Sequence, residues 1–325
     1  MSDSILDLHP LLRELSQTTI YFPEFAVAFS KLCNAIELCN LNKSPMSAII
    51  CGHSGVGKTT LLFEALSKYS KEFLEEKSDG IYIRDTAIYF EMPQPVSIRQ
   101  LIDDMLIRMG VSDARGSVAH LTSMLITQLQ TKGTRVIFLD EIQRLYLSNA
   151  DKVRIPILNW LNNFMNNLGI PVILAGTQQC RNITDYDEPF ASRYPWMIVL
   201  NPLEYERRPD SQYHRILEKF DQTMHELRPM ASEVHLNDVD IAAPLFIASS
   251  GNLKQISMIL TMAFYRCLGR SNSFGLTRAD LKYACDQFIL SHNLTTHNPF
   301  LLDLSSCSKI IVDTEEKRKK LRIPE

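Results

Sequence analysis

The sequence lacks the features that would place a protein in a membrane or outside the cell. No apolar run approaches the roughly 18 residues of a transmembrane helix. The amino-terminal Met-Ser-Asp-Ser is not followed by the basic and apolar regions of a secretory signal. The seven cysteines are an odd number without a Cys-x-x-Cys pair, which is typical of buried thiols in a reducing compartment rather than of disulfides or zinc ligands. We therefore expect a cytoplasmic protein with no membrane partner.

An excess of positive charge is also missing, because the formal net charge is −3. A nucleic acid would therefore have to be held by a local patch and not by the charge of the whole chain. A content of 45% hydrophobic and 22% charged residues is that of a soluble globular protein. A length of 325 residues suits one large domain or two modest ones.

Glycine is scarce, at 12 residues, but three of the twelve fall within residues 52–59, which read Gly-His-Ser-Gly-Val-Gly-Lys-Thr. This is a complete Walker A phosphate-binding loop. An apolar run at 49–51 precedes it and a helix-forming run at 60–69 follows, which is the strand–loop–helix context that the motif requires. Glycines without Cβ let the backbone point its N–H groups at an anion, and the helix N-terminus adds partial positive charge. The alternative is an ordinary glycine-rich turn.

We predict that Lys58 reaches the β- and γ-phosphates of ATP and that the Thr59 hydroxyl ligates Mg²⁺. The residues of this segment predicted to contact the nucleotide are Gly52, His53, Ser54, Gly55, Val56, Gly57, Lys58, Thr59 and Thr60.

A second nucleotide signal lies at residues 135–141, Arg-Val-Ile-Phe-Leu-Asp-Glu. Four consecutive apolar residues predict a parallel strand buried on both faces, and two carboxylates follow at its C-terminal end, where open α/β sheets bind ligands. This is a Walker B motif, in which Asp140 would hold Mg²⁺ through water and Glu141 would polarise the attacking water. A Glu directly after the Asp argues against small GTPases and nucleotide kinases. The alternative for Glu141 is an exposed acidic residue at a strand end.

Apolar runs that alternate with helical patterns predict a parallel sheet with helices between its strands. Besides the strands of the Walker A and Walker B motifs, strands are expected at 87–90, 172–176 and 197–200. The charged stretch 68–77 is interpreted as the solvated end of the helix that follows the Walker A loop. Beyond Pro202 only helical patterns remain, which predicts an all-α second domain.

The expected segments are residues 1–41, an N-terminal segment and helix that pack on the nucleotide site; 42–202, an α/β P-loop domain; 203–292, a helical lid; and 293–325, a tail with a basic cluster at 317–322 that could be flexible.

These motifs together resemble an AAA+ ATPase. Four further segments are similar to the TnsC/TniB family, ATPases that regulate DNA transposition, including that of CRISPR-associated transposons. They are Ile-Tyr-Phe-Pro at 20–23, Asp-Glu-Ile-Gln-Arg-Leu at 140–145, Ile-Pro-Val-Ile-Leu-Ala-Gly-Thr at 170–177 and Phe-Ala-Ser-Arg-Tyr at 190–194. The resemblance implies a three-layer AAA+ domain with a parallel sheet and a small all-α lid.

The resemblance also implies roles for residues at the edge of the site. Thr177 matches sensor 1, with Gln178 as a neighbouring candidate and a turn-capping threonine as the alternative. Arg193 matches the arginine finger that reaches the γ-phosphate of an adjacent subunit. Arg181 is its rival, and the alternative for Arg193 is an ion pair with Asp185, Asp187 or Glu188.

Two more matches lie outside the predicted sheet. Lys254 matches sensor 2, where lysine departs from the arginine often found, because it lacks the bidentate fork. Its alternative is a solvated helix lysine. Tyr21 and Phe22 match the segment that packs on the adenine, and the alternative is a hydrophobic staple on the first helix.

The implied partners are double-stranded DNA, further copies of the chain in a ring or helical assembly, transposase subunits, and a target-selection protein or RNA-guided complex. Arg99, Arg115 and Ser117 are the candidate DNA contacts, although ordinary solvated residues would have the same pattern. ATP hydrolysis would reset the assembly. A helicase-loader or initiator-like ATPase, and a nucleotide-gated scaffold with little turnover, remain alternatives.

Overall fold

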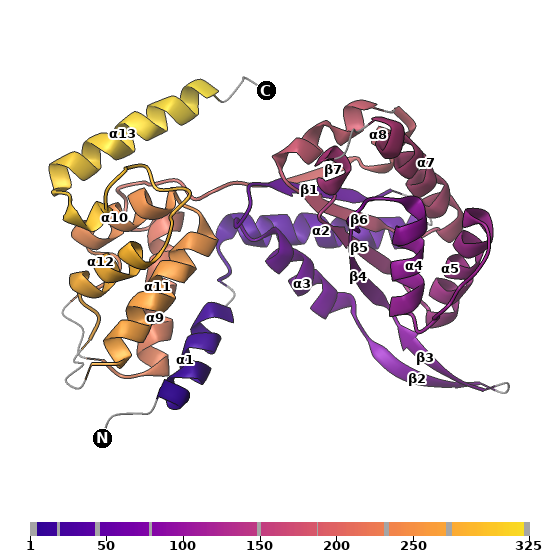
Figure 1. Ribbon diagram of the computed structural model, residues 1–325, viewed down its shortest axis with the longest axis horizontal. Helices are drawn as coiled ribbons and strands as arrows, with labels where there is room; N and C mark the ends of the chain where they lie inside the picture. The colour runs from indigo at the N-terminus through magenta and orange to yellow at the C-terminus, as the bar shows by residue number, and fades with distance from the viewer. Residues whose placement is uncertain are drawn as a thin grey trace. The chain divides into compact units, whose positions relative to one another are not determined.

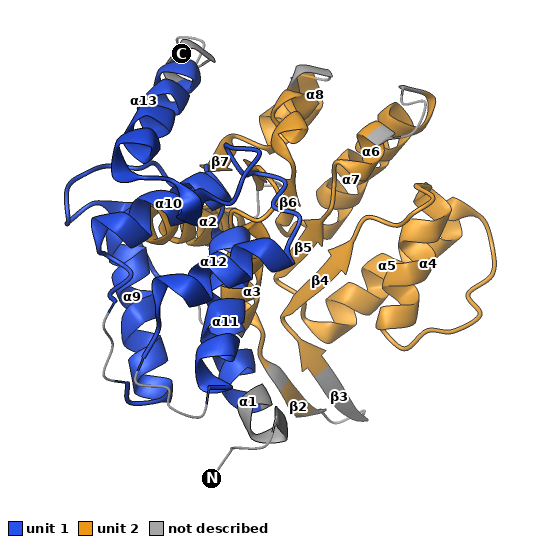
Figure 2. Ribbon diagram, turned by 60° about the vertical axis from the view of Figure 1, so that its left-hand side comes forward, with its two compact units in different colours: residues 1–23, 201–325 blue, residues 24–200 orange. Residues whose placement is uncertain are grey.

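The computed structural model describes residues 5–17, 20–42, 46–77, 80–147, 151–186, 188–230, 234–270 and 275–321 (Figure 1). The chain divides into two compact units, each described by itself below (Figure 2). One unit comprises residues 24–200, and the other comprises residues 1–23 together with 201–325. The N-terminal residues are thus grouped with the C-terminal part of the chain, and the four segments expected from the sequence stay a prediction.

The first unit is built around a five-stranded parallel sheet, as expected from the apolar runs. Its strands, in spatial order, are β4 (Ala87–Glu91), β5 (Val136–Asp140), β6 (Val172–Gly176), β1 (Ala48–Gly52) and β7 (Trp196–Leu200). Every residue of β1, β5 and β6 is buried, which is why these strands are apolar throughout and do not alternate. The order places β6 between the strands that lead into the two nucleotide motifs.

Helices cover both faces of this sheet and give the three-layer arrangement. On one face, alternate strand residues such as Ile49, Leu139 and Leu174 share a core with helices α4 (Ile98–Arg108), α5 (Val118–Lys132) and α7 (Asp151–Leu168). Helix α3 (Lys58–Tyr69) contacts β1, β4, β5 and β6. Figure 2 shows α3 and α2 (Pro23–Asn42) on the side away from α4 and α5. The shorter elements of this unit are α6 (Arg144–Leu147), the 3₁₀ helix η1 (Gln178–Tyr186) and α8 (Glu188–Arg193).

A β-hairpin follows α3 in the chain and precedes β4, and it corrects one expectation. Helix α3 ends at Tyr69, and β2 (Glu72–Lys77) pairs antiparallel with β3 (Gly80–Asp85). The interpretation of 68–77 as a solvated helix end is therefore wrong beyond Tyr69. The charged side chains concealed the strand because it lacks an apolar face, yet Asp79-Gly80 is a dipeptide typical of tight hairpin turns.

The second unit is entirely helical in the part that the structure describes. Its elements are α1 (Ile5–Gln17), α9 (Gln212–Leu227), α10 (Val239–Ser249), α11 (Leu253–Leu268), α12 (Arg278–Gln287), η2 (Pro299–Leu301) and α13 (Leu304–Leu321). Helix α1 packs on α9 and α11, and α13 packs on α10. Much of the segment expected to be a tail is therefore a helix packed within this unit. None of the helices in the described ranges has the length and apolar character needed to cross a bilayer.

The turn from α10 into α11 requires glycine. Gly251 has φ +74°, and a Cβ there would lie 2.0 Å from the carbonyl oxygen of Leu203. The next residue, Asn252, caps α11 by accepting a hydrogen bond from the N–H of Gln255. Arg318 of α13 also contacts this turn, because its Nη2 donates a hydrogen bond to the carbonyl oxygen of Ser250 at 2.8 Å. Contacts from Leu203, Asn252 and Arg318 thus hold the chain at residues 250–255, where α10 leads into α11.

Candidate functional site

The Walker A segment forms a tight loop between β1 and α3. Gly55 and Gly57 have φ values of +78° and +101°, which glycine adopts without steric cost. Gly57 is the N-cap of α3 and offers no side-chain hydrogen bond, so the first N–H groups of the helix are left for another acceptor. A Cβ on Gly52 would lie 2.3 Å from the carbonyl oxygen of Leu200, so only glycine lets β1 end this close to β7. These features are what a phosphate-binding loop requires.

The ammonium group of Lys58 folds back over this loop. Its Nζ donates to the carbonyl oxygens of Gly52 and His53 at 2.9 and 2.7 Å. Burial lowers the pKa of Lys58, and the carboxylates of Asp140 and Glu141 act in the opposite direction. A cation that is partly desolvated and has two carboxylates nearby is well placed to meet the charge of a phosphate chain.

The two nucleotide motifs meet in a hydrogen bond between Thr59 and Asp140. The Thr59 hydroxyl donates to Oδ2 of the Asp140 carboxylate at 3.0 Å, across the end of β6. Asp140 is 2% exposed, and its Oδ1 accepts from the N–H of Glu141 at 2.7 Å. The Tyr89 hydroxyl lies 3.3 Å from the same Oδ2 and also donates toward Glu91. The sequence analysis missed Tyr89, because its partner Asp140 lies 51 positions away along the chain.

The donor set at this point fits Mg²⁺. A hydroxyl and a carboxylate are oxygen ligands that Mg²⁺ accepts, and Thr59 and Asp140 already lie at hydrogen-bonding distance. Among the described residues, no three His, Cys, Asp or Glu side chains come together as a metal site of their own. Mg²⁺ here would therefore depend on phosphate oxygens and water for its other ligands, which is its usual mode with nucleotides.

Glu141 adopts a left-handed backbone conformation, with φ +62°. Its Oε2 accepts a hydrogen bond from Nε2 of Gln143 at 2.6 Å and lies 3.9 Å from Nε of Arg144. Oε1 of the same Gln143 accepts from the backbone N–H of Thr177 at 3.1 Å. Thr177 directly follows β6, so the structure brings this predicted residue to the edge of the sheet that carries both motifs.

Arg193 and its rival Arg181 lie on the segments that follow β6. Arg193 ends α8, and its carbonyl oxygen accepts from the N–H of Ser47 at 2.6 Å. Its Nε atom is buried without a hydrogen-bond partner in the part of the chain that the structure describes. Of the three predicted alternative ion-pair partners, Asp185 and Asp187 have side chains outside the described residues, and Glu188 is exposed. Arg181 is exposed on η1. Gln178, the first residue of the same 3₁₀ helix, is partly exposed.

The sequence model of the family described as bacterial TniB protein matches residues 13–201, which is more than half of the chain. The chain belongs to the TniB family. Among curated proteins, none matches its sequence.

Solved structures place this TniB-family chain in a known fold. The Orc1 protein of Aeropyrum pernix, solved in complex with DNA, has a TM-score of 0.59 at 17% identity, over 85% of this chain and 69% of that one. Cdc6p from Pyrobaculum aerophilum has a TM-score of 0.54 at 12% identity, over 94% of this chain and 89% of that one. At these identities the likeness establishes the fold alone, that of P-loop AAA+ proteins with a helical C-terminal region.

Three predicted nucleotide contacts of this TniB-family chain lie in the helical unit or at its boundary. Lys254 is exposed on the first turn of α11, two residues after the Asn252 cap. Tyr21 is 57% exposed, whereas Phe22 is buried. The roles of Lys254, Tyr21 and Phe22 stay predictions.

The three candidate DNA contacts come together at the connection between α4 and α5. Arg99 donates from Nη1 to the carbonyl oxygen of Gly116 at 2.8 Å and from Nε to Asp103 at 2.8 Å. The Ser117 hydroxyl caps α5 by accepting from the N–H of His120. Two of the three side chains therefore have a role within the chain, while Arg115 is exposed. Arg115 is the member best placed to reach a ligand.

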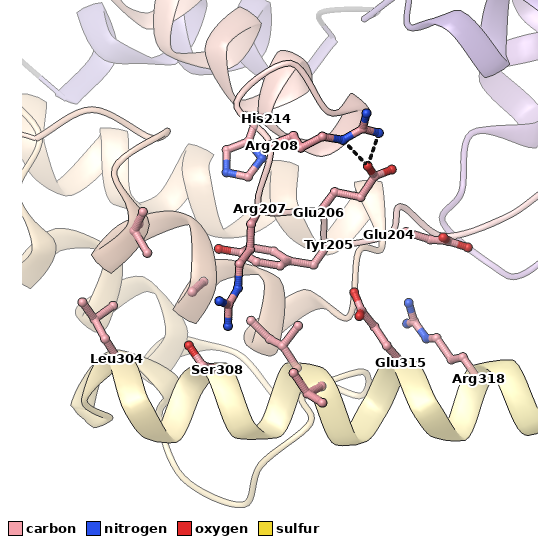
Figure 3. Close-up of a pocket in the computed structure, with 14 residues that line it drawn as sticks. Glu204, Tyr205, Glu206, Arg207, Arg208, His214, Leu304, Ser308, Glu315 and Arg318 are labelled. Atoms are coloured by element: carbon pink, nitrogen blue, oxygen red, sulfur yellow. Dashed lines mark hydrogen bonds and ion pairs between the residues drawn. The ribbon is translucent and has the colours of Figure 1, made fainter.

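The helical unit also contains a cavity of about 690 Å³ that no sequence motif predicts (Figure 3). It is bounded by the segment 204–208 and by α9, α10 and α13. Arg208 pairs with Glu206 on one wall, with Nε 3.1 Å from Oε2. Burial lowers the pKa of His214 on another wall, which favours a neutral imidazole at pH 7. The charges that line the cavity are of both signs, unlike those of the phosphate loop.

The position of Lys58 predicts that its removal abolishes most nucleotide binding. Lys58→Ala leaves the phosphate charge without its ammonium partner, so ATP affinity should fall about 10- to 100-fold, corresponding to about 1.5–3 kcal/mol for hydrogen bonds to a charged group. Titration with a fluorescent ATP analogue measures this change. Lys68→Ala is the matched control, because Lys68 is on the same helix but pairs with Glu37 on the surface. Equal affinity of both variants and the unmodified chain would reject the assignment.

Proposed function

We propose that this chain is an ATP-hydrolysing regulator of DNA transposition, which assembles on double-stranded DNA with ATP and links target-site selection to transposase recruitment. The observation that carries the proposal is the Thr59–Asp140 hydrogen bond, which joins the Walker A and Walker B motifs, in a chain of the TniB family. Hydrolysis then releases or resets the assembly.

The residues have distinct tasks in the proposed reaction. Lys58 and the loop N–H groups bind the phosphates. Thr59 and Asp140 would hold Mg²⁺, which would neutralise phosphate charge. Glu141 accepts the proton of the attacking water while the new oxygen–phosphorus bond forms and ADP leaves. The Thr177 hydroxyl orients the water or the γ-phosphate. Asp140, Glu141 and Thr177 end or follow the adjacent strands β5 and β6, and Thr59 bonds to Asp140 across the end of β6, which supports their joint action.

Duplex DNA is the proposed platform for assembly. The fold is shared with an Orc1 protein that was solved in complex with DNA. The exposed Arg115, on the connection between α4 and α5, is the proposed contact to the DNA backbone, with Arg99 and Ser117 shaping that connection. Contacts with phosphates carry no sequence information, so binding is expected to be weakly sequence-specific and sensitive to salt. Transposase subunits and a target-selection protein or RNA-guided complex are the proposed protein partners.

An initiator-like or helicase-loading ATPase is the second candidate, because the likeness to Orc1 and Cdc6p extends over 85% and 94% of this chain. The match to the TniB family over residues 13–201 favours transposition. A scaffold that binds ATP with little turnover is the third candidate, and it differs from both others in its rate of hydrolysis.

Glu141→Gln separates an ATPase from a scaffold. The amide cannot accept the proton, so kcat should fall about 10²- to 10⁴-fold, the usual contribution of a general base. ATP affinity should stay the same, because Lys58, Thr59 and Asp140 are intact. Phosphate release and analogue binding measure the two quantities, with the exposed Glu226→Gln of α9 as control. Equal and slow turnover in the unmodified chain and Glu141→Gln would favour the scaffold.

Arg193 is proposed to act on the ATP of an adjacent subunit. Arg193→Ala should then lower turnover, and mixing it with Lys58→Ala should restore part of the activity, because each protein supplies what the other lacks. Phosphate release across a series of mixing ratios tests this. Activity that never exceeds the sum of the separate proteins would contradict a finger acting between subunits.

Binding of duplex DNA tests the proposed platform. Fluorescence anisotropy should show tight binding with ATP and weak binding with ADP or without nucleotide. The logarithm of the affinity should fall linearly with the logarithm of the salt concentration, because bound counterions are released. Lys58→Ala should bind DNA only weakly under all conditions. An absence of binding in every nucleotide state would remove the transposition proposal and leave an AAA+ protein with another partner.

A further inference from the structure

Gln143 connects the proposed catalytic base to the end of β6. Its Nε2 donates to Oε2 of Glu141 at 2.6 Å, and its Oε1 accepts from the N–H of Thr177 at 3.1 Å. Both neighbours require the same orientation of the amide, because a backbone N–H only donates and a carboxylate only accepts. The side chain therefore forms a defined bridge between Glu141 and Thr177, which lie on the connections that follow two adjacent strands.

The surroundings of this bridge are tightly packed. A Cβ on Gly176 would lie 2.7 Å from Oε1 of Gln143 and 2.6 Å from a methyl group of Ile142. A larger residue at 176 would thus push the amide away from the strand. The absence of a side chain at the last position of β6 allows the Gln143 amide to reach the Thr177 N–H.

The backbone of Glu141 is fixed, so its carboxylate depends on its side-chain contacts. Its N–H donates to Asp140 Oδ1 at 2.7 Å, and its carbonyl oxygen accepts from the N–H of Arg144 at 3.0 Å. The Arg144 guanidinium lies 3.9 Å from Oε2 of Glu141 and also pairs with Glu91 at 3.1 Å. The 2.6 Å bond from Gln143 is the closer contact, and hydrogen bonds to ionised groups are the stronger kind.

We propose that Gln143 is a positioning residue that fixes the Glu141 carboxylate relative to the end of β6. The Glu141 carboxylate, the proposed group that activates water, then keeps its position relative to Thr177 at the end of β6. This inference rests on the proposed ATPase function, because it assigns a task to the contact between Gln143 and the proposed base. Within the described residues, the hydrogen bonds of the Gln143 side chain go to Glu141 and Thr177 and not to the Walker A loop or the Thr59–Asp140 pair, so its effect should be on turnover and not on nucleotide binding.

Gln143→Met tests the bridge, since methionine is similar in length but neither donates nor accepts as the amide does. A small misplacement of a catalytic group can cost about 100-fold in rate, so we expect kcat to fall about 10- to 100-fold. KM and the affinity for an ATP analogue should change less than about twofold. The exposed Gln179→Ala, two residues beyond Thr177, is the matched control and should leave all three quantities unchanged.

The same substitution on a Glu141→Gln background separates positioning from a general structural role. If Gln143 acts through Glu141, Gln143→Met should slow the unmodified chain but cause little further loss in Glu141→Gln, because residues that act as a unit are not additive. Amide hydrogen exchange supplies a readout independent of activity. The Thr177 amide should exchange faster in Gln143→Met and remain protected in Gln143→Glu, which keeps an acceptor for it.

The outcomes distinguish this inference from the function on which it rests. If the unmodified chain hydrolyses ATP and Gln143→Met turns over equally fast, the positioning role is wrong and the ATPase stands. An equal loss in both backgrounds, or a rise in KM that accounts for the loss, also overturns positioning. Turnover by the unmodified chain no faster than that of Lys58→Ala rejects the proposed function, and the inference with it.

Discussion

The candidate site depends on the alignment of three adjacent strand ends, which the hydrogen bond from Thr59 to Asp140 makes visible. Thr59 follows β1 and Asp140 ends β5, so this bond forms across the end of β6. The strand register keeps these ends level, since Leu174 of β6 is opposite both Ile49 of β1 and Leu139 of β5. A shift of one residue in either pairing would separate the hydroxyl from the carboxylate. The buried sheet is thus what brings two distant motifs into one site.

Much of the fold could be predicted because parallel strands buried on both faces appear in the sequence as apolar runs. Strands β1, β5 and β6 are examples, and the helix after the Walker A loop was indicated by the helix-forming run at 60–69. Strand β2 could not be recognised in the same way, because four of its six residues are charged and its two apolar residues, Phe73 and Leu74, are adjacent and so belong to opposite faces. Helix α13 was taken for a tail because its many charged residues conceal the few, such as Cys307 and Ile311, that are buried.

The site could be predicted only where a motif places its residues at fixed spacing. Lys58, Thr59 and Asp140 belong to such motifs, and the structure brings them together. Tyr89 and Gln143 did not emerge, since their partners Asp140 and Thr177 lie 51 and 34 positions away and no local pattern records such contacts. Arg99 illustrates the opposite case, because a basic residue available for DNA in the sequence is bonded to loop carbonyl oxygens in the structure. Charge alone does not tell which partner a guanidinium has.

The contact between Arg318 and Ser250 has a mechanical consequence. Arg318 lies near the end of α13, where the basic cluster begins, and its guanidinium holds the residue that precedes Gly251. Glycine is required there because Leu203 leaves no room for a side chain, so the turn has little freedom to absorb strain. A displacement of the end of α13 would therefore act on the turn that leads into α11, near Lys254. Helix α13 is thus coupled to the turn between α10 and α11 through the contact of Arg318 with Ser250.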